Sequence, residues 1–512
     1  MFKPVIPLIL LSFFTQALDA QLDAAQLSQR IEEERRAWDV PGMAVAVVKD
    51  GKVLLASGYG HLQDNLTEEV NEHTLFAIAS NTKAFVSAAI AMLVEEGAIR
   101  WDDPVRRYLP DFEMGDPCVS SLMTIKDLLC HRSGLGTFSG DVIWYKSTFT
   151  AAEAVKRISA VPPAFQFRNG YGYSNLMFIT AGEVIRAVTG LSWAEFVESR
   201  IFNPLDMTRT LTSVSQLGEL TNVASPHKPD GETHIPIPWV NWDNMGAAGG
   251  IISSVNDLSK WMILQLQGGV SVTGDTLFQS TSQDVMWTPH NSFTVSSGAR
   301  NFFPGRHFSA YSLGWSLADY QGRMLVSHGG GYDGMYSRVL LVPDEQLGIA
   351  ILTNSMKGIS TWLGYHILDQ FFENPVRDWM AFGLSRQQDG DRRRVEEIQK
   401  LLDSRVPETS PDFAPTECVG IYRCPMYGDI RIETGEDGNL RLIFPDAPDL
   451  NAGLSHWQYN TYRIDWDQTH AWFDFGTLQF MTDHHGKVKE LSFDVPNEDI
   501  FFHEIHAKRV AE

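Results

Sequence analysis

Residues 75–93 read LFAIASNTKAFVSAAIAML, an apolar run interrupted by one polar tetrad, Ser80-Asn81-Thr82-Lys83. The run resembles a buried helix, and residues three apart lie on the same helix face. In one interpretation the serine caps an ordinary helix and the lysine reaches solvent. In the other, Ser80 is a nucleophile beside the free N–H groups of the first turn, and burial lowers the pKa of Lys83 so that it accepts the serine proton. The spacing alone does not choose between them.

The same spacing occurs a second time, in Ser225-Pro226-His227-Lys228. Prolines stand inside and directly after this copy and no helical pattern follows, so its serine and lysine are not expected to share a helix face. We therefore exclude this copy and keep Ser80 and Lys83 as the candidates.

A second element, Tyr173-Ser174-Asn175, precedes a strongly periodic helical segment. A tyrosine shuttles a proton when a nearby ammonium lowers its pKa, and a carboxamide both donates to and accepts from a substrate amide. The alternative is a core tyrosine followed by a helix cap.

A third element, His328-Gly329-Gly330-Gly331, ends a predicted strand. Its glycines let a substrate lie along the strand edge and expose a backbone N–H as an oxyanion donor. The same letters occur in the oxyanion motif of α/β-hydrolase lipases, but those enzymes also need a Gly-x-Ser-x-Gly elbow, which this sequence lacks. A plain Gly-rich turn is the other alternative.

Together and in this order, the three elements resemble the motifs of the serine β-lactamase and penicillin-binding-protein family, in particular the class C type and its S12 peptidase relatives. The resemblance covers roughly residues 25–375 and extends to the stretches MTIKDLLCHRSGL, GAAGGIISSVNDLSKW and LVPDEQLGIAILTN. It implies an α+β fold in which helices flank an antiparallel sheet beside a helical subdomain. The strand-rich pattern over 308–354, between helical segments, favours the same class.

The resemblance also implies roles. Ser80 would be acylated, and Lys83 would be its base or would hold Tyr173 in a reactive state. Tyr173 would pass the proton to the leaving group and activate the deacylating water. Asn175 would bind the acyl amide or hold Lys83, and the N–H groups of Ser80 and Gly331 would form the oxyanion hole. No metal or cofactor is needed.

The sequence departs from the family at His328-Gly329-Gly330, where β-lactamases and carboxypeptidases usually have Lys-Thr-Gly. A histidine is mostly neutral at pH ~7 and does not replace a permanent cation for a substrate carboxylate. His328 and Gly330 remain expected substrate-binding residues, but the change favours an esterase, amidase, peptidase or acyltransferase over a true β-lactamase or D-Ala carboxypeptidase. An inactive binding protein on the same scaffold is the alternative of another class. Trp239 and Trp242 either line an acyl pocket or pack in the core.

The chain of 512 residues divides into four predicted parts. Residues 1–20 have the charged start and short apolar core of a signal peptide, which predicts a secreted or periplasmic protein. Residues 21–385 form the hydrolase-like domain, and 386–411 form a charged, then Pro-rich linker. Residues 412–512 contain short alternating runs that predict a small β-barrel, similar to the lipocalin-like domains attached to some S12-type hydrolases.

Charge and composition limit the partners. The formal net charge of −22 argues against nucleic acid or an anionic membrane surface. Beyond the signal segment no stretch reaches membrane-spanning length. A small molecule or short peptide is the expected substrate.

Four cysteines are present, and an even set in an oxidising compartment suggests disulfides. The simplest of three pairings joins Cys118 to Cys130 and Cys418 to Cys424, and the alternative is four free thiols.

Overall fold

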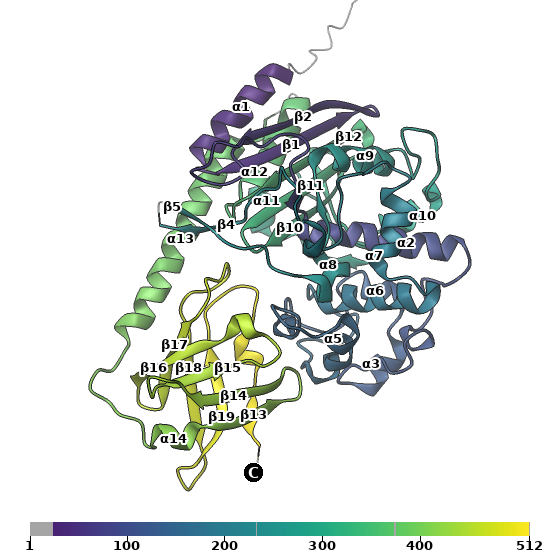
Figure 1. Ribbon diagram of the computed structural model, residues 1–512. Coiled ribbons are helices and arrows are strands. Elements are labelled where there is room, and N and C mark those ends of the chain that lie inside the picture. Colours follow the sequence, from purple (N-terminus) through teal and green to yellow (C-terminus); the bar gives the residue numbers. More distant parts are fainter. Residues whose placement is uncertain (1–23, 232, 373–374, 511–512) are drawn as a thin grey trace, which may run out of the picture.

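The computed structural model describes residues 24–510 apart from 232, 373 and 374. It contains a larger domain of sheet and helices and a smaller β-barrel (Figure 1). The predicted signal peptide lies outside the described residues.

The larger domain is built on one eight-stranded antiparallel sheet. The strand order is β2–β1–β12–β11–β10–β9–β8–β7, with bounds Lys52–Gly60, Gly42–Lys49, Leu347–Thr353, Met335–Val342, Arg323–Tyr332, Ser316–Tyr320, Ser309–Tyr311 and Asn291–Ser292. Strands β1 and β2 meet at Asp50-Gly51, whose φ angles of 51° and 72° fit the tight hairpin turn that an Asp-Gly pair between two apolar runs favours.

Both faces of the sheet are covered by helices, so β1 is buried along almost its whole length (Figure 1). Val45 and Val47 pack under α1, α12 and the start of α13, whereas Ala44 and Ala46 face the core that contains α2 and α9. The bounds of these helices are Ala24–Ala37, Ile359–Phe372, Trp379–Asp403, Thr82–Glu95 and Val255–Leu266. The alternation follows from the strand period of two.

A helical subdomain lies beside α2 and α9 and confirms the predicted α+β class. It contains α3 (Pro117–Leu122), α4 (Ile125–Leu128), α5 (Ala151–Arg157), α6 (Asn175–Thr189), α7 (Trp193–Val197) and α8 (Gly246–Gly249). Thr124, Thr150, Ser192 and Ser254 each have an acidic residue three positions later, the spacing that predicts a capping box. At Thr124, Thr150 and Ser192 the N-cap hydroxyl and the acidic side chain bond each other's backbone, whereas at Ser254 only the hydroxyl accepts from the Asp257 N–H.

Short elements complete the larger domain: α10 (Ser280–Met286), α11 (Ser297–Phe302), the paired strands β3 (Phe76–Ala77) and β6 (Ile252–Ser253), and the hairpin of β4 (His227–Asp230) and β5 (Thr233–Pro236). The β3–β6 pair holds the segment before Ser80 against the start of α9.

The C-terminal unit is a closed barrel of eight strands, as the alternating pattern predicts. Successive strands pair antiparallel and β13 closes the barrel against β20; the bounds are β13 Gly420–Cys424, β14 Gly428–Thr434, β15 Leu440–Ile443, β16 Ala452–Gln458, β17 Thr461–Trp466, β18 Thr477–Thr482, β19 Val488–Asp494 and β20 Ala507–Arg509. Large side chains such as Tyr422, Phe444 and Phe502 are completely buried, so the barrel fills with its own residues.

The predicted linker, 386–411, falls largely on α13, a helix of 25 residues that begins in the larger domain. Trp379 and Met380 in its first turn are buried. Most of its remaining length is exposed and leads to the barrel (Figure 1). Arg394 donates to the carbonyl of Trp472, so the helix also contacts the barrel that it connects. The short helix α14 (Pro415–Cys418) follows.

The predicted disulfides are wrong, because all four cysteines are free. Cys118 is exposed on α3, whereas Cys130 is fully buried after α4. Strand β13 rises about 3.3 Å per residue and carries Cys424 away from Cys418. Spacing along the chain was a poor guide because helix and strand separate the members of each pair.

No helix in the described part of the chain is both long and apolar enough to cross a membrane.

Candidate active site

Ser80 lies in the 3₁₀ turn η1 (Ala79–Asn81), directly before α2. Ala79 has a φ of 46°, a left-handed conformation that costs energy for a residue with a side chain. Strand β10 runs against this turn, and a Cβ at Gly330 would lie 2.3 Å from the Ile78 carbonyl oxygen. Glycine at 330 therefore lets the strand approach the serine.

Lys83 is completely buried in the first turn of α2, and its Nζ contacts three oxygens. It lies 3.0 Å from Ser80 Oγ, 2.8 Å from Asn175 Oδ1 and 2.8 Å from the carbonyl oxygen of Ala248. The last two can only accept, so they take two N–H groups of the amine. Ser80 is the one of the three partners that can also donate, so in a neutral Lys83 the lone pair faces the serine hydroxyl.

Burial lowers the pKa of Lys83 well below its ordinary value, and the Asp141 carboxyl offsets this only in part. The two oxygens that anchor the amine are neutral, so no full negative charge in contact with it restores the ammonium. A lysine in this environment is suited to act as a base near neutral pH.

Tyr173 lies beside the same amine, with Lys83 Nζ 4.7 Å from the centroid of its ring. Burial raises the pKa of Tyr173 well above its ordinary value, and a hydrogen bond with Ser80 lowers it only in part. The prediction that a nearby ammonium lowers the pKa of Tyr173 is therefore wrong, because desolvation of the phenol has the larger effect. Tyr173 is a neutral phenol in the resting site and is suited to donate a proton.

Asn175 is the first residue of α6 and connects Lys83 to a buried carboxyl. Its Nδ2 donates to Asp141 Oδ2 at 2.7 Å while its Oδ1 accepts from Lys83. Three hydrogen bonds thus lead from Asp141 to the Ser80 hydroxyl. This favours holding Lys83 over binding an acyl amide, since both ends of the Asn175 carboxamide are already engaged.

His328 is buried on β10 and has a defined tautomer. Its Nδ1 lies 2.6 Å from the Gly329 carbonyl, which only accepts, so Nδ1 carries the proton and Nε2 accepts from the Tyr311 hydroxyl at 2.8 Å. Burial lowers the pKa of His328 to about 3. The ring is therefore neutral and supplies no positive charge to a substrate carboxylate.

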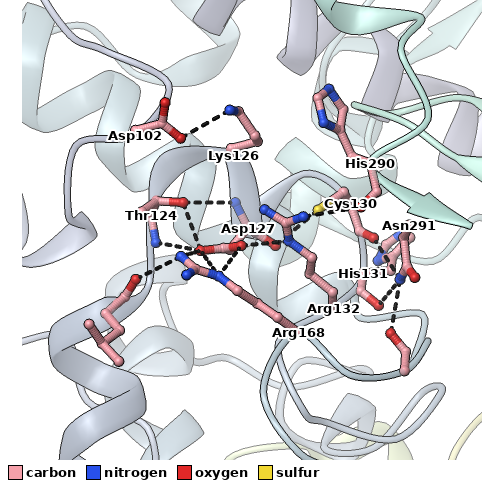
Figure 2. Close-up of polar contacts among 12 residues, drawn as sticks. Asp102, Thr124, Lys126, Asp127, Cys130, His131, Arg132, Arg168, His290 and Asn291 are labelled. Atoms are coloured by element: carbon pink, nitrogen blue, oxygen red, sulfur yellow. Dashed lines mark hydrogen bonds and ion pairs between the residues drawn. The ribbon is translucent and has the colours of Figure 1, made fainter.

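The loop that carries the Tyr-Ser-Asn motif is tied to the segment that follows α4 (Figure 2). Asp127 is completely buried and pairs with Arg132 and with Arg168, each at 2.6 Å. The Asn291 side chain donates to the His131 carbonyl. His131 Nδ1 accepts the N–H of Ser174 in the motif. These contacts position the tyrosine, and the stretch MTIKDLLCHRSGL supplies most of them.

These groups open onto a cleft with a volume of about 280 Å³. Its walls include the predicted residues Ser80, Tyr173, Asn175, His328, Gly331 and Trp242. Aromatic side chains that sequence reasoning did not select, Phe138, Trp144, Tyr171 and Tyr311, form much of the remainder. Trp239 lies outside the cleft lining and packs on Tyr332. Within the described residues no group of three His, Cys, Asp or Glu side chains is placed to hold a metal ion.

The barrel closes one side of the cleft with Trp472, Asp499 and Ile500. Its position is set by polar contacts to the larger domain: Glu504 accepts from the Gly140 N–H at 2.7 Å, and Lys228 pairs with Asp474. The barrel thus covers the cleft in addition to filling its own interior.

Sequence reasoning missed Asp141, Tyr311, Trp472 and Asp499. Asp141 and Tyr311 lie outside the three motifs, in GDVIWY and SAYSLGW, and carried no signal of their own. Trp472 and Asp499 belong to the barrel, and only the packing of the two domains brings them to Ser80.

The fold is that of the serine beta-lactamases and transpeptidases. The chain belongs to the beta-lactamase family, whose model matches residues 27–365. A family described only as a domain of unknown function (DUF3471) matches residues 404–509.

Among curated proteins, the chain is similar to the unguisins hydrolase ungD' of Aspergillus campestris (strain IBT 28561), with 29% identity over 80% of this chain and 78% of that protein. Protein flp of Staphylococcus aureus (strain N315) is 28% identical over 64% of this chain and 62% of its own. A D-stereospecific amidohydrolase from a Streptomyces species is 25% identical, with a TM-score of 0.53 over 65% of this chain and 94% of that one. The octameric penicillin-binding protein homologue of Pyrococcus abyssi shares the fold over 95% of this chain and all of its own, with a TM-score of 0.59 and 19% identity.

Proposed function

We propose that this protein is a serine hydrolase that cleaves amide bonds, and related esters, through an acyl-enzyme on Ser80. The observation that carries the proposal is the placement of Lys83. Two oxygens that can only accept orient its amine, and its remaining contact is the Ser80 hydroxyl at 3.0 Å.

Acylation begins when the neutral amine of Lys83 takes the proton of Ser80 and the serine oxygen attacks the substrate carbonyl. The negative charge that develops on the carbonyl oxygen is met by the N–H groups of Ser80 and Gly331. Tyr173, which burial keeps as a phenol, donates its proton to the departing amine. The phenol regains a proton from the Lys83 ammonium.

Deacylation runs the same transfers with water as the nucleophile. Lys83 borders the Ser80 oxygen, so its neutral amine can accept a proton from a water that attacks the ester carbonyl and can then return that proton to Ser80 Oγ. The products are a free acid and the restored hydroxyl of Ser80.

An amide substrate without a carboxylate next to the scissile bond is favoured over penicillins. His328 stands where the family usually has a lysine, and its ring is neutral. The names of the relatives point the same way, since one is a hydrolase and another an amidohydrolase.

Labelling with a fluorophosphonate, followed by mass spectrometry, tests the proposal. An adduct on the peptide that contains Ser80, absent from Ser80→Ala, is expected. Equal labelling of wild type and Ser80→Ala would contradict it. Turnover of a panel of amides, esters and β-lactams, with and without an added amine, then separates hydrolysis from acyl transfer.

A further inference from the structure

The cleft has an acidic wall that the catalytic steps do not use. Asp141 stands at the start of the 3₁₀ turn η3 (Asp141–Ile143) and is only 1% exposed. Its Oδ2 accepts from Asn175, but its Oδ1 has no hydrogen-bond partner among the described residues. The indole N–H of Trp144 lies close enough to this carboxyl to lower its pKa in part, but neither Nε1 nor Oδ1 has a hydrogen bond of good geometry among the described residues.

A second carboxyl reaches the same cleft from the barrel. Asp499 lines the cleft from the loop after β19, and within the described residues its side chain has neither a hydrogen bond nor an ion pair. The Asn497 side chain accepts from the N–H groups of Asp499 and Ile500, at 3.0 and 2.6 Å, and fixes the loop. The charge of Asp499 acts on Asp141, so the two carboxyls share one space.

Hydrogen bonds join the two domains beside these carboxyls. Glu504, on the same barrel segment as Asp499, accepts from Ser139 and from the N–H of Gly140. Asp141 directly follows Gly140 in the chain, so this contact between the domains lies next to the first carboxyl. Contacts between the domains therefore hold the loops that carry the two carboxyls and fix the relative position of these groups.

No arginine or lysine is among the described side chains that line this cleft. Two desolvated carboxyls without a counter-charge are costly, and burial raises the pKa of Asp499 to about 7 and that of Asp141 to about 8. A cation placed between them would remove the cost, because it pairs with both groups at once.

We propose that the cleft binds substrates whose acyl group carries a protonated amine, held between Asp141 of the larger domain and Asp499 of the barrel. This inference rests on the proposed function, since it names the substrate class of that site. Asp141, Asp499 and Ser80 line the same cleft, so we place the amine on the carbon next to the scissile carbonyl.

The aromatic walls complete the description of the substrate. Trp144, Trp242 and Trp472 border the cleft and offer apolar faces to a side chain and favourable faces to a cation. The favoured class is an amide of an apolar or aromatic amino acid with a free α-amine, or a short peptide cleaved after its first residue.

Calorimetric binding to Ser80→Ala tests the inference without requiring turnover. The ligands are phenylalanine amide and N-acetylphenylalanine amide, each in both D and L forms, at about pH 7.5. Ser80→Ala should bind at least one enantiomer of the free amine 10-fold or more tightly than its acetylated counterpart. In Ser80→Ala/Asp499→Asn this preference should fall to about 3-fold or less.

The matched control is Ser80→Ala/Asp494→Asn, which removes an exposed carboxylate at the end of β19, outside the cleft lining, and should keep the preference. Equal binding of free and acetylated amides, no binding of either, or a preference that survives Asp499→Asn would overturn the inference. Its failure is distinguishable from failure of the proposed function, because fluorophosphonate labelling of Ser80 reports the latter independently.

Discussion

The chain contains two Ser-x-x-Lys segments, and the structure puts them to different uses. Ser80 and Lys83 lie on consecutive turns of η1 and α2, with 3.0 Å between hydroxyl and amine. Lys228 lies in strand β4, whereas Ser225 lies in the loop before it, so the two residues share no helix face. There the serine donates to Gln63, and the lysine pairs with Asp474 of the barrel.

Both lysines are buried, so burial alone does not make a base. Lys228 has a carboxylate in direct contact and forms an ion pair with it. Lys83 has only neutral oxygens in contact, which leaves desolvation free to lower its pKa. The difference teaches that the partners supplied by the fold, more than the spacing, separate a catalytic lysine from an ion-pairing lysine.

The largest expected effect comes from replacing each of the two serines by alanine in separate variants. Ser80→Ala should lower kcat for an amide substrate by about 10⁴-fold or more, because the covalent route is lost. Ser225→Ala should keep kcat within about 2-fold, since it removes one hydrogen bond far from the reaction. Steady-state kinetics of the two variants checks this, and comparable losses would break the comparison.

The two lysines give the next effect. Lys83→Met should slow acylation by up to about 10⁴-fold, because the Ser80 proton loses its acceptor. Lys228→Met should leave the labelling rate of Ser80 nearly unchanged and should destabilise the contact with the barrel. Rates of fluorophosphonate labelling, together with thermal unfolding, separate the two outcomes. A strong loss of labelling in Lys228→Met would contradict the distinction.

Tyr173→Phe sharpens the comparison within the catalytic set. The phenol is needed to protonate a poor leaving group, so kcat for an unactivated amide should fall by about 10²-fold. An activated ester with a nitrophenolate leaving group needs no such proton and should be affected less. The ratio of the two rate losses is the measurement, and equal losses would show that Tyr173 acts on both groups alike.

The smallest effect concerns Asp499, a buried ionisable group that, like Lys83, has no opposite charge in contact. Burial raises its pKa to about 7, whereas an unfolded aspartate releases its proton near pH ~4. The folded state therefore holds a proton that the unfolded state has lost, and this contribution to stability is lost as pH rises through about 7.

Asp499→Asn should accordingly lose less free energy of unfolding than wild type between about pH 5 and about pH 8.5, by at most about 2.7 kcal/mol. Denaturant unfolding at both pH values measures the difference, with Asp494→Asn, an exposed carboxylate of the same barrel, as the control. An identical pH dependence in Asp499→Asn and wild type would show that Asp499 is not desolvated in solution.

Much of the architecture followed from local signals. The Asp50-Gly51 hairpin, the capping boxes and the alternating runs of the barrel each depend on contacts within a few residues, so a linear pattern is sufficient to find them. The disulfide prediction failed because it took closeness along the chain for closeness in space. The lowered pKa expected for Tyr173 failed because the depth of burial is not a property of the motif.

The sequence by itself determined the family, the α+β class and the three motifs, because these depend on residue types at short spacings in recognisable contexts. Only the tertiary structure decided which Ser-x-x-Lys segment has a neutral set of partners, that His328 is committed to Tyr311, and that Asp499 of the barrel faces Asp141. The physical reason is that pKa values and binding sites depend on desolvation and on charges from residues far apart in the chain, which packing alone brings together.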